Sequence, residues 1–153
     1  MPLGTSGADR SHRVDRGAIV VDASVAAAWC FEDEVSPFTE SVLDAVVRDG
    51  ARVPALWIVE MTNVLTMAER HGRLDAARVD QVVAALAALP VTLDHGDVGS
   101  QTPTLVRLAR AHHLAAYDAA YLELAMRTGL PLATRDGSLQ AAAKRVGVSL
   151  FDA

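Results

Sequence analysis

Four acidic residues stand beside or within apolar stretches of the 153-residue sequence, where a lone carboxylate is costly to bury. Asp22 directly follows the apolar run 18–21, and Asp136 comes shortly after a second apolar run. Glu60 lies inside a segment with helical periodicity, and Asp118 opens another. Carboxylates that lie close together stay ionised only if a cation compensates their charge. Magnesium and manganese ions prefer oxygen ligands, and they support reactions at phosphate groups by activating water.

Each acid also has an explanation that involves no chemistry. Asp22, Asp118 and Asp136 are placed where an aspartate could cap a helix, and Gly-Ser after Asp136 is typical of a turn. Ser24 could cap the first helix instead of Asp22. Glu60 could lie on a solvated stripe of a partly exposed helix. These alternatives stay open for each residue taken singly, and the joint placement of the four acids is what favours a site.

Short apolar segments alternate with helical ones along the chain. This alternation predicts the α/β fold class, with a central parallel sheet flanked by helices. The predicted strands are 18–21, 52–54, 91–93, 130–133 and 148–151. The predicted helices are 36–49, 55–71, 75–89, 103–113, 118–128 and 137–146, with a short helix or turn at 24–31. Since such sheets place their sites outside the carboxyl ends of the strands, three of the four acids are expected to converge at that edge.

Composition predicts one domain, which we expect to span residues 18–153. The chain is 51% hydrophobic, enough for a sizeable core, and the polar segment 1–17 is expected to be a disordered lead or tag. No apolar stretch is long enough for a transmembrane helix, and the N-terminus has no apolar signal region. The single cysteine, Cys30, has no partner for an internal disulfide. We therefore expect a cytoplasmic protein with no membrane partner.

The net charge of −5 does not favour a general nucleic-acid binder, because affinity for phosphate comes from lysine and arginine. It does not exclude an enzyme that holds nucleic acid through metal ions. Lys144 is the only lysine, and arginine makes bidentate contacts to phosphate that lysine does not make. A general bias in composition would explain the scarcity of lysine equally well.

Four motifs give the chain a resemblance to a known family. They are VVDASV at 20–25, WIVEMTNVL at 57–65, YDAAYLELA at 117–125 and LATRDGSL at 132–139. In this order and spacing they resemble the PIN-domain family, and within it the VapC-like toxins of type II toxin–antitoxin systems. The resemblance covers nearly the whole chain from about residue 19. It implies a Rossmann-like domain and a metal-dependent ribonuclease that uses Mg²⁺ or Mn²⁺ at a quartet of carboxylates.

The resemblance assigns a role to each member of this quartet. Asp22 and Asp118 would bind the metal directly. Glu60 would bind the ion or orient its water, and Asp136 would complete the site directly or through water. The catalytic base would come from the metal's water rather than from a side chain, and cleavage of RNA would leave a 3′-hydroxyl and a 5′-phosphate.

Other polar residues of the same motifs match positions that line such a site. Ser24, Asn63 and Thr134 would support the acids or contact substrate. Arg135, next to the last acid, is a candidate contact for an RNA phosphate. His112 and His113 are adjacent and diverge on a helix, so we assign them no ligand role.

The resemblance also implies protein partners. A small VapB-like antitoxin would insert its C-terminal segment near the acids and could place an arginine on them, and the protein would form a homodimer. The apolar stretches 25–31 and 56–67 suit either partner contacts or the core. Core is the simpler interpretation, because apolar helical faces are usually buried within a domain.

Two other functions remain possible from the sequence. A catalytically silent PIN-like module would keep the fold and only bind a partner. A receiver-like phosphoacceptor would also be a parallel α/β protein that binds Mg²⁺, but it would be expected to carry paired acids after the first strand and a lysine after a late strand. Here Asp22 stands alone and Lys144 lies inside a predicted helix. Glu123 is expected to be an ordinary surface residue.

Overall fold

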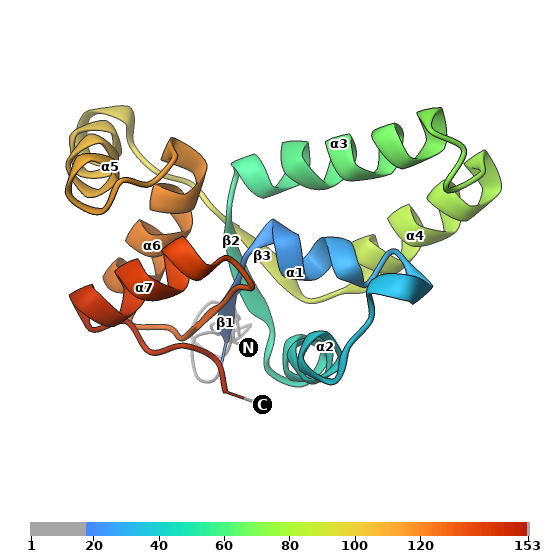
Figure 1. Ribbon diagram of the computed structural model, residues 1–153, viewed down its shortest axis with the longest axis horizontal. Coiled ribbons are helices and arrows are strands. Elements are labelled where there is room, and N and C mark those ends of the chain that lie inside the picture. Colours follow the sequence, from blue (N-terminus) through green and yellow to red (C-terminus); the bar gives the residue numbers. More distant parts are fainter. Residues whose placement is uncertain (1–17, 153) are drawn as a thin grey trace, which may run out of the picture.

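Four short parallel strands form the centre of the computed structural model, which describes residues 18–152 (Figure 1). The strands are β1 (Ile19–Val21), β2 (Ala51–Pro54), β3 (Val91–Asp94) and β4 (Leu132–Ala133). They pair in the order β3-β2-β1-β4, and every pair is parallel. All of β1 is buried, which suits its β-branched sequence Ile-Val-Val. The α/β class is confirmed, and the predicted lead at 1–17 lies outside the described residues.

Helices cover both faces of this sheet. In the described residues they are α1 (Ala23–Ala28), α2 (Pro37–Asp49), α3 (Leu56–Arg70), α4 (Ala76–Ala88), α5 (Val98–His112), α6 (Ala116–Thr128) and α7 (Gly137–Val146), with a short 3₁₀ helix at Glu32–Glu34. Figure 1 shows α1 to α4 on one side of the strands and α5 to α7 on the other. α6 contacts β1, β2 and β4 as well as α5 and α7, and every residue from 119 to 125 is buried. It is therefore a core helix.

Polar side chains explain where several helices begin. The Ser36 hydroxyl accepts a hydrogen bond from the Thr39 backbone N–H, and the Thr39 hydroxyl accepts one from the Ser36 N–H, which forms a capping box before Pro37. Asp75 caps α4 through the N–H of Arg78. The helices predicted at 36–49 and 75–89 therefore begin next to the residues from which they were predicted to start.

Two helices begin at least two residues earlier than predicted, and the last strand is shorter. α5 starts at Val98 rather than at residue 103, because Asp97 caps it through the N–H of Ser100. Pro103 lies inside this helix, near its start, where it removes one backbone hydrogen bond. α6 starts at Ala116 rather than at 118. The predicted strand 148–151 is reduced to one parallel bridge, between residues 132 and 150.

Of the two apolar stretches left open between core and partner contact, 25–31 is mostly core, whereas 56–67 buries only one side of its helix. Their buried residues are Val25, Ala26, Ala28, Cys30, Phe31, Trp57, Met61 and Leu65. Ile58 and Val59 are exposed instead. A search of residues 18–152 for a helix that could span a membrane finds none.

Candidate active site

The strand order reverses direction next to β1. β2 and β3 follow on one side of β1, whereas β4 lies on its other side. Open α/β sheets bind their ligands at such a switch point, outside the carboxyl ends of the strands. Asp22 directly follows β1, and its backbone N–H donates to the carbonyl of Ala133 at the end of β4, at 3.0 Å. The first predicted acid therefore lies at the switch point.

A cavity of about 340 Å³ lies at this edge, and all four predicted acids line it. Asp22 comes from the end of β1, and Glu60 comes from α3. Asp118 comes from the first turn of α6, and Asp136 immediately precedes α7. The rest of the lining is Ala23, Ser24, Ala27, Asn63 and Val64. The fold thus brings together acids from four separate motifs, which is one more than the topology alone predicted.

Asp22 is held by neutral hydroxyl groups. Its side chain makes no capping hydrogen bond to α1, although the residue occupies the N-cap position. Instead, Oδ2 accepts hydrogen bonds from Ser24 Oγ and from Thr134 Oγ1, both at 2.8 Å. Asp22 is 5% exposed and Thr134 is 2% exposed, so this arrangement is fixed within the core. The capping alternative is wrong for Asp22, and the predicted supporting roles of Ser24 and Thr134 have a structural basis.

Glu60 is held by a residue that the sequence analysis did not assign to the site. The hydroxyl of Tyr121, on α6, donates to Glu60 Oε1 at 2.8 Å. Burial raises the pKa of Glu60 above its ordinary value, Tyr121 opposes that rise, and the charges of Asp22 and Asp118 add to it. Glu60 is thus half-buried on this helix, and Tyr121 holds one oxygen of its carboxylate. The signal in the sequence was a tyrosine three residues after Asp118 in the same motif, but nothing there showed which residue it contacts.

Asp118 lies inside the first turn of α6, because the N-cap of that helix is Ala115. The capping alternative is therefore wrong for Asp118. Burial raises the pKa of its carboxyl, and the charges of Asp136 and Asp22 raise it further. Its side chain accepts no hydrogen bond from any residue in the range 18–152.

Asp136 caps a helix and also lines the cavity. Its Oδ1 accepts a hydrogen bond from the Leu139 N–H at 2.8 Å and caps α7, so the capping interpretation is confirmed. Its own N–H donates to Thr134 Oγ1 at 3.0 Å, which connects it to the hydroxyl that holds Asp22. Asp136 is exposed and lines the cavity. One carboxylate thus starts a helix and still faces the site.

The remaining two predicted residues lie differently. Asn63 lines the cavity one turn of α3 after Glu60 and is exposed. Arg135 is exposed and does not line the cavity, and its Nη2 donates to the carbonyl of Ser24 at 2.9 Å. This hydrogen bond holds the guanidinium beside the residues that form the cavity.

The donor set of the cavity suits a hard divalent cation, because all four candidate ligands are carboxylates. Glu60 and Asp118 have raised pKa values, partly through like charge, and a cation would relieve that repulsion. Within residues 18–152, no three His, Cys, Asp or Glu side chains are grouped tightly enough to surround one ion. Mg²⁺ does not need such a cage, since it keeps several waters and binds through one or two carboxylates plus substrate phosphates.

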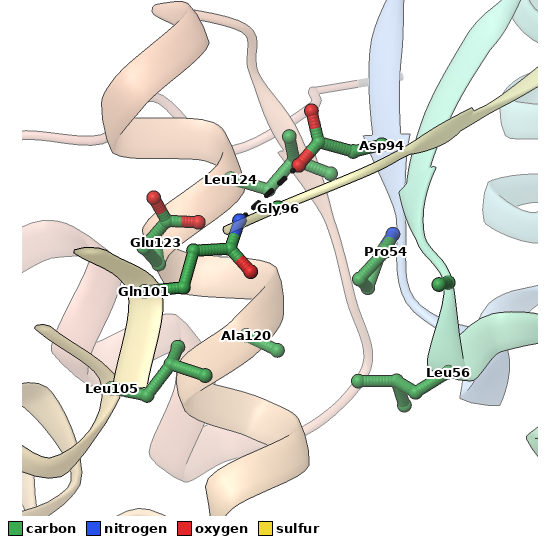
Figure 2. A pocket seen from close by; sticks show the side chains of 10 residues that line it. Pro54, Leu56, Asp94, Gly96, Gln101, Leu105, Ala120, Glu123 and Leu124 are labelled. Atoms are coloured by element: carbon green, nitrogen blue, oxygen red, sulfur yellow. Dashed lines mark hydrogen bonds between the residues drawn. The ribbon is translucent and has the colours of Figure 1, made fainter. Parts of the chain in front are cut away.

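A second cavity, of about 220 Å³, lies where β2 and β3 end beside α5 and α6 (Figure 2). Its carboxylates, unlike those of the acidic cavity, are neutralised. Asp94 is paired with Arg52 and Arg127, and Gln101 Nε2 lies 3.5 Å from its Oδ2. Glu123 is 8% exposed and pairs with Arg127 Nε at 2.7 Å. The expectation that Glu123 is a surface residue is wrong, because α6 is buried on this side as well.

The fold and the four motifs agree with a comparison against known families. The model of the PIN domain matches residues 19–145, so the chain belongs to the PIN-domain family. PIN domains are generally nucleases, and membership supports a hydrolase in this class. The resemblance predicted from the motifs is confirmed, and the match favours a nuclease over the receiver-like alternative.

Two solved structures are similar to this chain. PAE2754 from Pyrobaculum aerophilum is 28% identical, with a TM-score of 0.61 over 83% of each chain. FitAcB from Neisseria gonorrhoeae is 17% identical, with a TM-score of 0.63 over 88% of this chain and 96% of that one, which shows the shared fold. A search of curated proteins gave no significant match.

Proposed function

We propose that the protein is a divalent-metal-dependent endoribonuclease of the VapC-like toxin type, which hydrolyses phosphodiester bonds of RNA at the acidic cavity. The observation that carries this proposal is the lining of that cavity. Four carboxylates from separate motifs meet there, at the switch point of the sheet, in a chain of the PIN-domain family.

A bound Mg²⁺ or Mn²⁺ would supply a polarised phosphate and an activated water. In this proposal Asp22 is a ligand of fixed orientation, because two hydroxyl groups hold its carboxylate. Asp118 is the second direct ligand. Tyr121 holds one oxygen of Glu60, and the cap of α7 holds one oxygen of Asp136. In each residue the other oxygen accepts no hydrogen bond from residues 18–152, and it is the oxygen proposed to face the ion or its water.

RNA would reach the acids as a single strand, since specific recognition of RNA relies on accessible unpaired nucleotides. Arg135 is the candidate phosphate contact, because its guanidinium is exposed and is held beside the cavity by the carbonyl of Ser24.

The proposal includes two protein partners. A small VapB-like antitoxin would cover the acids with an arginine, and a second copy of the chain would form a homodimer. Three exposed apolar side chains offer contact area on the helices that carry two of the acids. Ile58 and Val59 on α3 are 49% and 70% exposed, and Tyr117 on α6 is 61% exposed.

The test is cleavage of a mixed pool of small RNAs by the purified protein, with Mg²⁺ or Mn²⁺ and with EDTA. Asp22→Asn is compared with wild type and with Asp80→Asn, which makes the same change at an exposed position of α4. We expect metal-dependent cleavage by wild type and Asp80→Asn, and at least about a hundredfold loss in Asp22→Asn. Circular dichroism and thermal unfolding establish that the three proteins are folded.

Equal cleavage by wild type and Asp22→Asn would contradict the proposal. Calorimetric titration with Mn²⁺ separates the catalytically silent alternative, because a silent module would bind no metal at the cavity. Mn²⁺ binding that is lost in Asp22→Asn supports the assignment of the cavity independently of any RNA.

A further inference from the structure

Tyr121 stands out among the core residues of α6 because its polar atom is directed at the acidic site. The residue is 1% exposed, and its hydroxyl donates to Glu60 Oε1 at 2.8 Å, across 61 positions of sequence. A phenylalanine would fill the same space in the core. The hydroxyl therefore adds a contact to Glu60 rather than volume.

The contact between Tyr121 and Glu60 has one direction. An ionised carboxylate has no proton to donate, so the phenol hydroxyl is the donor and Glu60 Oε1 is the acceptor.

This hydrogen bond divides the two oxygens of Glu60. Oε1 is committed to Tyr121, whereas Oε2 accepts no hydrogen bond from any residue between 18 and 152. Glu60 lines the cavity, so Oε2 is the oxygen left for a cation there. Because this hydrogen bond orients the carboxylate, turning Glu60 to present both oxygens to one ion would distort the bond.

We propose that Tyr121 is a positioning residue that restricts Glu60 to binding a cation through one oxygen, and that it thereby favours Mg²⁺ over Ca²⁺. Mg²⁺ demands nearly octahedral coordination at short distances, which single carboxylate oxygens and waters satisfy. Ca²⁺ takes six to eight oxygens and accepts both oxygens of one carboxylate. The inference rests on the proposed function only in placing a divalent cation at this cavity.

Tyr121→Phe tests the proposal because it removes the hydroxyl and keeps the ring. Direct calorimetric titration with Mn²⁺, followed by competition with Mg²⁺ and with Ca²⁺, gives the affinities of the metal-free protein for all three ions. The affinity for Mg²⁺ is expected to fall while that for Ca²⁺ holds or rises. The ratio of Mg²⁺ affinity to Ca²⁺ affinity should fall by about tenfold. This factor corresponds to losing one hydrogen bond to a charged group.

Two further variants control the measurement. Thr66→Val removes a hydroxyl from an exposed position of α3, the helix that carries Glu60, and it should leave the ratio unchanged. In a Glu60→Gln background, Tyr121→Phe should no longer change the ratio, because the proposed effect acts through the Glu60 carboxylate. Thermal unfolding of each variant records any general loss of structure.

The outcomes separate the positioning role from a structural one. A tenfold change in the ratio that disappears in Glu60→Gln supports the proposal. Equal losses of Mg²⁺ and Ca²⁺ affinity, or no loss, overturn it and leave the nuclease proposal standing. If the wild-type protein binds none of the ions, both proposals fail together.

Discussion

Replacing Arg127 by methionine is expected to destabilise the fold by about 2–3 kcal/mol. Arg127 bonds Glu123 through Nε at 2.7 Å and also bonds Asp94, whose carboxylate Arg52 contacts at 3.1 Å. The side chains of Glu123 and Asp94 are only 10% and 8% exposed, and removing one partner of a buried ion pair costs about 3–5 kcal/mol. Arg127 itself is 43% exposed and Asp94 keeps Arg52, so water screening and the remaining pair lower the figure.

Urea unfolding at pH 7 measures this loss, with Arg48→Met as the matched control. Arg48 pairs with Asp49 at 2.9 Å, but its side chain is 69% exposed, so the control should cost less than about 0.5 kcal/mol. Both variants remove one arginine and introduce the same side chain. Their difference therefore reports burial of the ion pairs rather than loss of charge.

The loss in Arg127→Met should also depend on pH. Burial tends to raise the pKa of Asp94, but the hydrogen bonds and charges of Arg127 and Arg52 outweigh it and hold the pKa below its ordinary value. A lowered pKa in the folded state means that Asp94 stabilises the fold above the unfolded-state pKa and loses this contribution as the pH falls. The difference in free energy of unfolding between wild type and Arg127→Met should therefore narrow below about pH 4. A loss at pH 7 no larger than that of Arg48→Met, or a gap that widens in acid, would refute this reasoning.

Two predictions concern the acidic cavity itself. Thr134→Val removes the buried hydroxyl that donates to Asp22. It should lower the free energy of unfolding in urea by about 1–2 kcal/mol and weaken Mn²⁺ binding measured by calorimetry. Thr66→Val, at an exposed site of α3, should do neither. Equal effects of the two valines would contradict the role of the Thr134 hydroxyl. Asp118→Asn should stabilise the metal-free protein slightly at pH 7, by less than about 1 kcal/mol. Burial and the charges of Asp136 and Asp22 raise the Asp118 pKa, so its ionisation opposes folding, but water screens these charges at a partly exposed residue. This gain should shrink as the pH falls and the wild-type carboxyl takes up its proton; a destabilised Asn variant would count against the reasoning.

The sequence was sufficient to place most elements of the fold, since periodicity and capping residues act locally. Ser36 and Asp75 began helices as predicted, because a side-chain oxygen three residues before a backbone N–H is a short-range signal. The start of α5 was missed for a local reason too. Pro103 looked like a first helical residue, but Asp97 offered an earlier cap and the helix tolerates the proline in its second turn.

The candidate site could be predicted in outline but not in its contacts. Strand direction and order decide which acids lie at the same edge of the sheet. The alternation of strands and helices in the sequence was enough to predict a parallel sheet and therefore that shared edge. Tyr121 on α6 and Glu60 on α3 form a hydrogen bond between two helices, and no local sequence pattern predicts that contact. Glu123 was misplaced because α6 is buried through residues 119–125, so its sequence has no polar face from which its orientation could be read.

The carboxylates of the two cavities differ in the groups that hold them. At the ends of β2 and β3, Asp94 and Glu123 are met by arginines, and their charge is cancelled inside the protein. In the acidic cavity, Asp22 and Glu60 receive hydrogen bonds only from hydroxyl groups among the described residues. Arginines of this protein thus serve stability in one cavity, and the other keeps its negative charge.

This difference is what a cation site requires. A carboxylate must be oriented to bind an ion. An arginine could orient it, but the guanidinium would also neutralise the negative charge that attracts the ion. Ser24, Thr134 and Tyr121 solve the problem because hydroxyl groups orient an oxygen without cancelling its charge. The same physics would give the proposed antitoxin a means of inhibition. One arginine supplied from outside would occupy carboxylate oxygens of the acidic cavity, as Arg127 does for Asp94, and a divalent ion would then have to displace it.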